Sequence, residues 1–380
     1  MRVLHVGKYY PPVAGGVEVF TADLCRAQVR RGHAVQALVH DREAGQQDDA
    51  GVEVVRAAVL GELLFTPVSP GFRGALSRAI GDFRPDVIHA HVPNPSALWL
   101  LTLPAARAIP CVLHWHSDIV ASTLDRRLAL AYRAYRPFER RLLARSSRVI
   151  ATSPPYLESS AELAPYRERC RVVPLGIDID RFAMDAQVAP SWPGSGTRRV
   201  LAVGRLTYYK GFDRLVEAVS RIDASLVIVG GGADEAALRA LAREHGCEDR
   251  VRIVAQADDS ERDAWLASCD VLCQPSLERT EAFGVVLLEA FAFGKPVVAS
   301  DLEGSGAPWV VEACGGGLLA PTGDVAALAG RLDELLAAPD RAAAFGAAGR
   351  ATLRERFTID AVAAAVDAVY AECVGASPST

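Results

Sequence analysis

Two glutamates flank an apolar run in the segment ERTEAFGVVLLEA, residues 278–290. Paired carboxyl groups that hydrolyse a glycosidic bond stand roughly 5 to 9.5 Å apart, whereas the eight residues from Glu281 to Glu289 would span about 12 Å of continuous helix. Phe283 and Gly284 predict a turn between them, with Glu281 in the loop and Glu289 inside the helix. The amide groups at that helix start would attract an anion. The spacing therefore favours binding of a phosphorylated ligand at several points over a pair of hydrolytic carboxyl groups.

Two cations stand in the segment LAVGRLTYYKGFDRL, in the loop between a predicted strand and a predicted helix. Gly204 ends the strand, and Arg205 and Lys210 follow it five residues apart. Arginine offers a planar fork and lysine a point charge, so the pair suits a diphosphate. A solvated basic loop is the plain alternative. The position at a strand end favours the functional interpretation.

A glycine pair, Gly15 and Gly16, lies between the first predicted strand and the helical run VEVFTADLCRAQVRRG. Bare backbone amides at a helix start hold anions, typically phosphates. A simple turn is an equally good interpretation of two adjacent glycines. The spacing is not G-x-G-x-x-G, so a nicotinamide dinucleotide loses its main support.

Histidines alternate with other residues in DVIHAHVPNP and in CVLHWHSD. Residues two apart share one face of a strand, so His89 with His91 and His114 with His116 could ligate zinc. No third ligand follows at a zinc-site spacing, and a metal-free polar cleft at the strand ends is the favoured interpretation. His116 and Asp118, where the strand gives way to a loop, are the best candidates to touch a substrate.

The candidate residues can come together only if the strands before them end at a common edge of a sheet. The chain contains two series of such predicted strands. Short β-branched runs alternate with helical stretches before residue 182 and again after residue 198, which predicts an α/β fold with two doubly wound, Rossmann-like parallel sheets facing across a cleft. We expect an N-terminal domain over 1–181, a linker over 182–198, a second domain over 199–355, and a C-terminal helix over 356–380 that packs back on the first domain.

Composition limits the remaining function classes. The chain has 380 residues and a net charge of −5, which does not suggest nucleic-acid binding. Its eight cysteines lie mostly in apolar runs, typical of buried thiols in a reducing compartment. No apolar stretch is long enough to span a membrane. Residues 123–148 carry eight arginines against two acids, which suggests either an anionic membrane surface as partner or a solvated helix pair broken at Pro137.

Several motifs taken together resemble the family 4 glycosyltransferases of GT-B fold, over nearly the whole chain and in the family's order. These are KYYPPVAGG, HSD after a strand, SPPYLESS, VVPLGIDIDRF, VGRLTYYKGFDRLVEA, LERTEAFGVVLLEAFAFGKPVVASD and LLAPTGD. The variants are similar to those of bacterial enzymes that build O-antigen or exopolysaccharide, often mannosyltransferases. The resemblance implies a retaining, metal-independent hexosyltransferase without a cofactor, in the cytoplasm or peripheral on the inner face of the plasma membrane.

The resemblance also implies roles for single residues. Glu281 would meet the hydroxyls of the donor sugar and Glu289 the nucleotide ribose, while Arg205 and Lys210 would neutralise the donor diphosphate. The remaining expected contacts are His116 beside the donor sugar, Gly16 and Gly204 near the donor, Phe283, Gly284 and Val285 on the sugar and phosphate, and Gly15 and Asp118 on the acceptor.

The expected partners are a nucleotide-sugar donor and a glycan or polyprenyl-diphosphate-linked acceptor. The segment GSGAPWVVE with Trp309 departs from the glutamate that many relatives carry there, so donor contacts in that loop stay open. A nucleotide-sugar epimerase of the same fold and a non-catalytic sugar-nucleotide-binding subunit are the rival interpretations.

Overall fold

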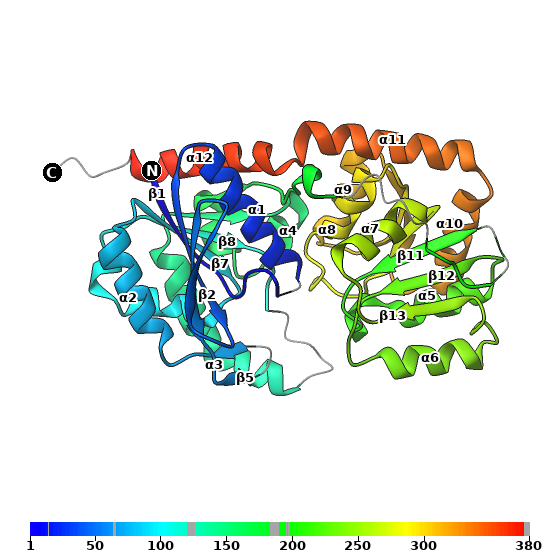
Figure 1. Ribbon diagram of the computed structural model, residues 1–380, viewed down its shortest axis with the longest axis horizontal. Helices are drawn as coiled ribbons and strands as arrows, with labels where there is room; N and C mark the ends of the chain where they lie inside the picture. Colours follow the sequence, from blue (N-terminus) through cyan, green and yellow to red (C-terminus); the bar gives the residue numbers. More distant parts are fainter. Residues whose placement is uncertain are drawn as a thin grey trace. The chain divides into compact units, whose positions relative to one another are not determined.

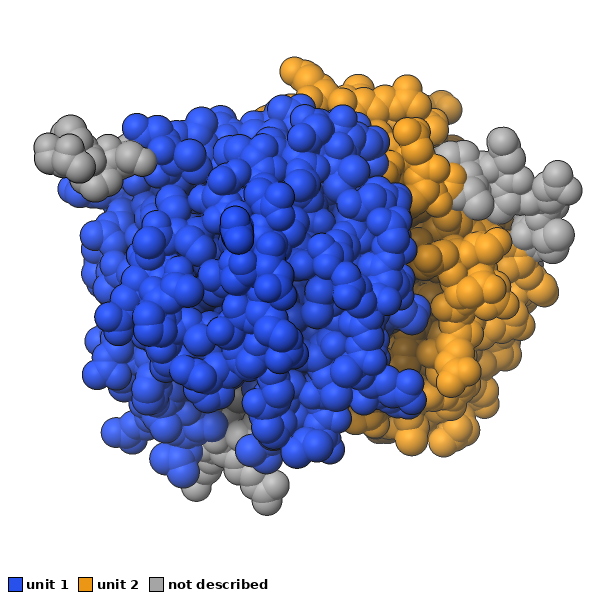
Figure 2. Space-filling model, turned by 60° about the vertical axis from the view of Figure 1, so that its left-hand side comes forward, with its two compact units in different colours: residues 1–176, 359–380 blue, residues 177–358 orange. Residues whose placement is uncertain are grey.

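The computed structural model describes residues 1–13, 15–63, 66–119, 126–182, 190–194, 196 and 198–375, without the side chains of 126–129. The chain divides into two compact units, which are distinguished by colour in Figure 2. Unit 1 comprises residues 1–176 and 359–380, and unit 2 comprises residues 177–358. The domain limits expected from the sequence stay a prediction beside this division, and most of the expected linker, 183–189 with 195 and 197, lies outside the described residues.

Unit 1 is built on a sheet of eight strands in the order β10-β9-β8-β7-β1-β2-β4-β3. Every neighbouring pair is parallel except β3 with β4 at one edge. The strands are β1 (Arg2–Val6), β2 (Ala34–Asp41), β3 (Gly45–Asp49), β4 (Val52–Ala58), β7 (Val87–Val92), β8 (Cys111–Trp115), β9 (Arg148–Ala151) and β10 (Cys170–Val172), with a separate hairpin of β5 (Gly61–Leu63) and β6 (Thr66–Val68).

Helices cover both faces of this sheet (Figure 1). Helix α1 (Gly16–Arg30) packs against α12 (Ile359–Val374) on one face, and α2 (Phe72–Phe83) packs against β1 and β2 on the other. The remaining helical elements of unit 1 are α3 (Arg126–Arg145), α4 (Pro154–Ser159), η1 (Pro95–Leu101), η2 (Pro104–Ala106) and η3 (Ala164–Arg169). Because both faces are covered, the central strands are buried along most of their length. Most of their residues are apolar, and the exceptions include His5, His89 and His114.

Unit 2 holds a second sheet, in which all six strands are parallel in the order β13-β12-β11-β14-β15-β16. Its strands are β11 (Arg199–Val203), β12 (Ser225–Val229), β13 (Val251–Val254), β14 (Val271–Gln274), β15 (Val297–Asp301) and β16 (Gly317–Pro321). Its helices are α5 (Phe212–Ser220), α6 (Glu235–Glu244), α7 (Asp259–Ser268), α8 (Val285–Ala292), α9 (Gly306–Cys314), α10 (Val325–Leu336) and α11 (Pro339–Arg356), with the short turns η4 (Ile179–Arg181) and η5 (Tyr208–Lys210).

The core of unit 2 lies on both sides of its sheet. Residues of α5, α6 and α10 form one apolar cluster with alternate strand residues such as Ala202 and Ile228. The intervening residues Leu201, Val227 and Leu272 are fully buried as well, and α8 and α9 pack against β14 and β15. The prediction of two doubly wound parallel sheets is confirmed in the described residues.

One local prediction is wrong. Helix α3 continues through Pro137, where the arginine-rich segment was expected to break. A proline inside a helix removes one amide donor, but Leu142 and Leu143 after it are buried and the hydroxyl of Tyr132 donates to Glu139 across it (2.9 Å). These contacts hold the two halves of the helix together. Among the described helices, none combines the length and apolar composition that a membrane crossing requires.

Candidate functional site

The two predicted ligands of a phosphorylated substrate, Lys210 and Glu281, form an ion pair in unit 2. Lys210 ends η5, just after β11, and Glu281 lies in the loop between β14 and α8. Both side chains are mostly buried, and the hydroxyl of Ser276 also donates to Glu281 (3.3 Å). Burial lowers the pKa of Lys210, but the charge and hydrogen bond of Glu281, together with the charge of Tyr209, raise the net pKa above its ordinary value. A fixed, charged ammonium group therefore stands at the carboxyl edge of this sheet.

The backbone around this pair is closely packed. Gly204 has a φ of 153°, and a Cβ at that position would lie 3.3 Å from the Lys210 side chain. Gly230 and Gly232, after β12, approach the same loop so closely that a Cβ would lie 2.2 Å from the carbonyl oxygens of Gly204 and Leu206 respectively. Only glycine fits at such approaches. Arg205 is exposed next to this loop, and its charge opposes the protonated form of Lys210.

Helix α8 begins where the sequence predicts it, directly after the loop that carries Glu281. Gly284 has a φ of 80°, a left-handed conformation that favours glycine, and Val285 is the first helical residue. Phe283 is buried against Trp309 and Phe357, with ring centroids 6.4 Å from each. The first turn of α8 therefore follows the loop that carries Glu281, and the expected anion site at its amide groups stays a prediction.

Sequence reasoning did not find Gln274, the last residue of β14. Its side chain is 4% exposed, and neither polar atom of its amide has a partner among the described residues. A Cβ at Gly284 would lie 2.6 Å from its Oε1, so the amide lies against the start of α8. A polar residue at the end of the apolar run VLCQ was the signal available in the sequence.

Glu289 lies inside α8 and bonds a different cation from Glu281. Arg181, in η4, donates to its Oε1 (3.0 Å), and the charge of Glu289 helps to raise the pKa of Arg262, although burial opposes the shift. The two glutamates therefore belong to two separate ion pairs. Arg181 was also missed, although it lies in the quoted motif VVPLGIDIDRF.

In unit 1, Gly15 and Gly16 stand at the start of α1, as predicted. A Cβ at Gly15 would lie 2.0 Å from the carboxylate of Glu18, so an acidic group already faces this helix start. The anion site at Gly15 and Gly16 stays a prediction.

Asp118 has contacts within unit 1. Its Oδ1 accepts from the indole of Trp115 (2.8 Å) and from the hydroxyl of Ser160 (2.7 Å), which ties the loop after β8 to the segment after α4. Its expected role in acceptor binding stays a prediction.

Five histidines form one layer on the face of the sheet that α1 and α12 cover. They are His5 on β1, His89 and His91 on β7, and His114 and His116 at the end of β8. All are at most 5% exposed, so both His-x-His pairs are packed inside unit 1. The expected polar cleft and the contact of His116 with a substrate stay predictions. The alternation along β7 and β8 points both pairs to the same face, and His5 pairs with His89 in the sheet register.

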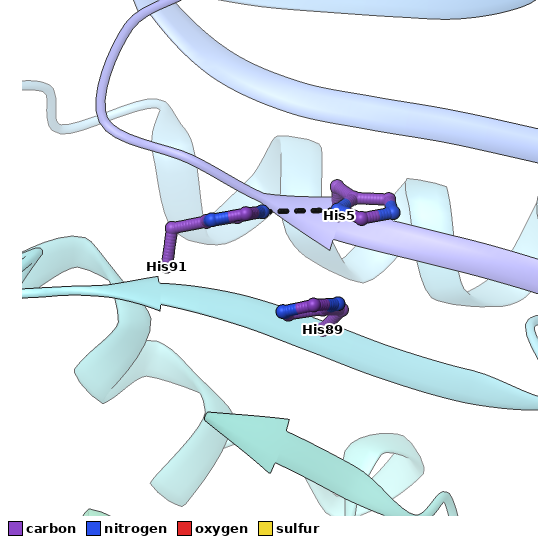
Figure 3. A group of neighbouring side chains, drawn as sticks. All are labelled: His5, His89 and His91. Atoms are coloured by element: carbon purple, nitrogen blue, oxygen red, sulfur yellow. Dashed lines mark hydrogen bonds between the residues drawn. The ribbon is translucent and has the colours of Figure 1, made fainter. Parts of the chain in front are cut away.

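The layer is held together by hydrogen bonds between ring nitrogens. His5 Nδ1 lies 3.0 Å from His91 Nε2 (Figure 3). His91 Nδ1 lies 2.9 Å from His116 Nε2. Gln28 of α1 accepts from His5 Nε2 at 2.7 Å. A second chain links His89 Nε2 to His114 Nδ1 (3.2 Å).

The nitrogens of two groups, His5 with His89 and His91, and His91 with His114 and His116, lie within 4.8 Å of one another. A metal needs lone pairs that converge on one point. In the layer the stacked rings lie within 28° of parallel, and several lone pairs are used in hydrogen bonds between rings. This geometry supports a hydrogen-bonded layer over a metal centre.

Comparison with known proteins adds independent findings. The family model described as Glycosyltransferase Family 4 matches residues 14–181, and the model described as Glycosyl transferases group 1 matches residues 189–352. The chain is 32% identical over 366 residues to O-antigen chain mannosyltransferase C of Escherichia coli, covering 95% of each chain. It is 31% identical over 388 residues to a phosphatidyl-myo-inositol mannosyltransferase of Mycobacterium leprae (strain TN), covering 100% of this chain and 98% of the other.

Solved structures agree with these matches. The sucrose-phosphate synthase (tll1590) of Thermosynechococcus elongatus superimposes with a TM-score of 0.84 at 25% identity, over 99% of this chain and 100% of the other. WaaG, a glycosyltransferase involved in lipopolysaccharide biosynthesis, gives a TM-score of 0.71 at 19% identity, over 97% of this chain and 99% of the other. The latter likeness is one of fold alone.

The histidine layer predicts that the folded state loses stability in mild acid. Burial lowers the pKa of His5 to about 4 and that of His116 to about 3, and holds those of His89, His91 and His114 well below 6.5. Unfolded histidine titrates near 6.5. The stabilisation is therefore complete above pH 6.5 and is lost as the pH falls toward 4, by up to about 1.4 kcal/mol per pH unit for each histidine.

Denaturant unfolding followed between pH 7.5 and 4.5 measures this slope. Burial raises the pKa of Glu139 to about 7, so this one carboxyl group opposes the loss of stability in acid. Burial also lowers the pKa of His40, outside the layer, to about 4, which adds to the loss. The five histidines of the layer dominate the slope. A free energy of unfolding for unit 1 that stays constant between pH 7 and 5 would contradict the prediction.

Proposed function

Because the chain belongs to the family 4 glycosyltransferases, with two parallel-sheet units of GT-B fold, we propose that it moves a hexose from a nucleotide-diphosphate sugar to a lipid-linked or oligosaccharide acceptor. Mannose is the favoured hexose, and synthesis of a bacterial surface polysaccharide is the favoured process. Two relatives are named as mannosyltransferases, which supports the choice of mannose. The name of one of them, for an O-antigen chain, supports the choice of process.

The observation that carries the proposal is the buried ion pair of Lys210 and Glu281 beside the start of α8. When the bond from the sugar to a diphosphate breaks, negative charge develops on the leaving group. A charged Lys210, the exposed Arg205 and the free amides of α8 stand in one region of unit 2, at the end of the sheet where ligands of such folds bind. Preorganised positive groups stabilise that charge where it forms.

We infer a retaining mechanism without a divalent ion. Lys210 and Arg205 supply the cationic charge that a metal would otherwise bring to the diphosphate, and the leaving phosphate takes the acceptor's proton on the same face of the sugar. Glu281 then serves two partners, since it orients Lys210 and also accepts from the sugar hydroxyls. Glu289, held by Arg181 (3.0 Å), accepts from the ribose.

A transfer assay tests the function. Thermal shift with GDP, UDP, dTDP and ADP selects the nucleotide, and the matching nucleotide sugars are then incubated with the enzyme, with and without lipid-linked and oligosaccharide acceptors. The proposal expects glycosylated acceptor with the anomeric configuration of the donor, in the presence of EDTA. Conversion of the donor to a second nucleotide sugar without an acceptor would identify an epimerase, and binding without turnover would identify a non-catalytic subunit.

Within this assay, Lys210→Ala and Glu281→Ala are expected to lower turnover by orders of magnitude, because each removes part of the charge that meets the leaving group. Either change leaves one buried charge without its partner, which destabilises the fold. The double variant K210M/E281Q removes both charges together and separates the two effects.

The double variant should be as inactive as the single ones while melting close to the wild type. Arg221→Ala is a matched control, since this exposed arginine at the end of α5 pairs with Glu217 of that helix (2.7 Å) and lies outside the proposed site. Near-normal turnover of K210M/E281Q would contradict the diphosphate assignment.

We also propose that α3 binds an anionic membrane surface, where a lipid-linked acceptor would be found. A shallow depression of about 470 Å³ is lined by four arginines and a proline of this helix, Arg133, Arg136, Pro137, Arg140 and Arg141. Leu130 is 70% exposed and Phe138 is 46% exposed on the same helix. Exposed apolar residues among arginines are typical of helices that lie in a lipid interface.

Liposome flotation tests this proposal. Vesicles containing phosphatidylglycerol should carry the protein at low salt, and the variant R133A/R141A should lose most of that binding, because each surface cation contributes about 1 kcal/mol. The variant R239A/R243A, which removes two arginines from α6, serves as the matched control. Equal flotation of the two variants, or no flotation of the wild type, would refute the membrane role of α3.

A further inference from the structure

The hydrogen bonds of the histidine layer have a direction, and the side-chain amide of Gln28 sets it. An amide oxygen can only accept and an amide nitrogen can only donate. Gln28 presents Oε1 to His5 Nε2 (2.7 Å) and Nε2 to the hydroxyl of Tyr370 (3.1 Å). His5 must therefore carry its proton on Nε2, which leaves a bare lone pair at Nδ1.

The direction passes from His5 to His116 through His91. Because His5 Nδ1 accepts, His91 donates from Nε2, and its own Nδ1 then accepts from His116 Nε2. Thr21 does not interrupt this chain, since its hydroxyl donates to the carbonyl of Val17 (2.7 Å). The low pKa values that burial imposes keep all three rings neutral at pH 7. His116 is thus left with its proton on Nε2 and a lone pair on Nδ1.

The second chain runs in the opposite sense from the same amide. The Gln28 nitrogen donates to Tyr370, whose hydroxyl bonds His89 Nδ1, and His89 donates from Nε2 to His114 Nδ1. Burial keeps the pKa of Tyr370 well above 10, so its hydroxyl retains the proton to donate. His114 is left with an N–H group at Nε2.

Both chains end without a partner. His116 Nδ1 and His114 Nε2 are buried polar atoms that bond no other described residue. Their rings are parallel to within 1°, with centroids 4.4 Å apart. Since the other nitrogen of each ring bonds a histidine of β7, the two free nitrogens point away from β7, toward β9.

A third unpartnered atom belongs to the same place. Thr152 follows the register pair Trp115 and Ala151 by one residue on β9, as His116 does on β8, so it lies beside His116. Its Oγ1 is fully buried and has no partner within the described part of the chain. Buried polar groups in native proteins are almost always satisfied, by protein, water or ligand. An acceptor, a donor and a hydroxyl at the carboxyl end of two parallel strands therefore mark a place for a polar ligand group.

We propose that Gln28, acting through His5 and His91, holds His116 as the tautomer protonated at Nε2. In the contact with the donor sugar that the family resemblance implies for His116, this tautomer makes Nδ1 the acceptor of a sugar hydroxyl. Gln28, His5 and His91 are positioning residues, because they touch no substrate and act through His116. The choice of a sugar hydroxyl rests on the proposed glycosyl transfer. The tautomer itself is a property of the ligand-free protein and does not depend on that function.

The position of the proton on His116 has a chemical consequence for the choice of donor sugar. A lone pair at Nδ1 attracts a hydroxyl hydrogen and repels a fluorine, which can accept but cannot donate. A His116 protonated at Nδ1 would tolerate both. The position of one proton, fixed through the chain from the Gln28 amide, therefore decides whether a fluorinated donor is accepted.

Nitrogen-15 NMR of the histidine side chains tests the tautomer directly. Long-range proton–nitrogen spectra of the full chain, labelled at histidine, distinguish a protonated ring nitrogen from a bare one, and the spectrum of His116→Asn assigns the signal. At pH 7.5 we expect a bare Nδ1 and a protonated Nε2 on His116. A protonated Nδ1 would overturn the inference.

Two matched variants separate positioning from packing. His91→Phe and His89→Phe each replace a fully buried ring on β7 with another ring, but only His91 bonds His116. H91F should turn the single tautomer of His116 into a mixture and raise the KM for the donor roughly 2- to 10-fold, the worth of one hydrogen bond. H89F should leave the His116 signal unchanged. The same effect of both variants on His116 would overturn the chain as the cause.

Mono-deoxyfluoro donors identify the hydroxyl. With the wild type, replacing one sugar hydroxyl by fluorine should raise KM at one ring position, and that penalty should shrink in H91F. If every fluorinated donor binds like the parent, the group at His116 Nδ1 is water and the sugar contact is refuted. A protein with the expected tautomer and no transferase activity would contradict the proposed function alone, whereas an active enzyme with a protonated Nδ1 would contradict this inference alone.

Discussion

Strands that run parallel deliver their carboxyl ends to one edge of a sheet, and the chemistry of both units depends on that constraint. In unit 2 it brings Lys210, after β11, to Glu281, after β14, although 71 residues separate them. In unit 1 it brings His116 at the end of β8 beside Thr152 at the end of β9. The helices that follow these strands start at the same edge, so their free amides add positive potential there. The fold thus concentrates polar groups at the carboxyl edges of its two sheets, and in unit 1 the buried histidine layer leads to that edge.

The two units keep buried polar groups by different means. Unit 2 uses opposite charges, and Lys210 stays protonated because Glu281 and Tyr209 together outweigh its loss of solvent. Unit 1 uses neutral imidazoles, and burial keeps each of them uncharged while hydrogen bonds satisfy most of their nitrogens. A charged group is appropriate for a site that binds a diphosphate. A chain of neutral, hydrogen-bonded imidazoles is appropriate for a site that presents one lone pair in a fixed position. Each arrangement fits the part of the donor that we assign to it.

Much of this arrangement could be predicted from the sequence. Continuous β-branched runs identified the parallel strands, and the glycine at position 284 identified the turn that separates Glu281 from the helix with Glu289. The polar edge strand β3, with the sequence GQQDD, carries no apolar signal and was missed. The helix through Pro137 was missed because tertiary contacts outweigh one lost amide. The histidine layer is completed by His5 of β1, Gln28 of α1 and Tyr370 of α12. These contacts join segments far apart in the sequence, so no local pattern predicts them. Gln274 and Arg181 join the unit 2 site for the same reason.

The central claim is that Lys210 binds the diphosphate of a nucleotide sugar. Isothermal titration with the nucleoside diphosphate and monophosphate of the preferred base, on the wild type and on K210M/E281Q, tests it without any acceptor. We predict that the wild type binds the diphosphate at least about tenfold more tightly, in line with hydrogen bonds to charged groups, and that the double variant loses this preference. A double variant that still prefers the diphosphate as strongly as the wild type would contradict the account.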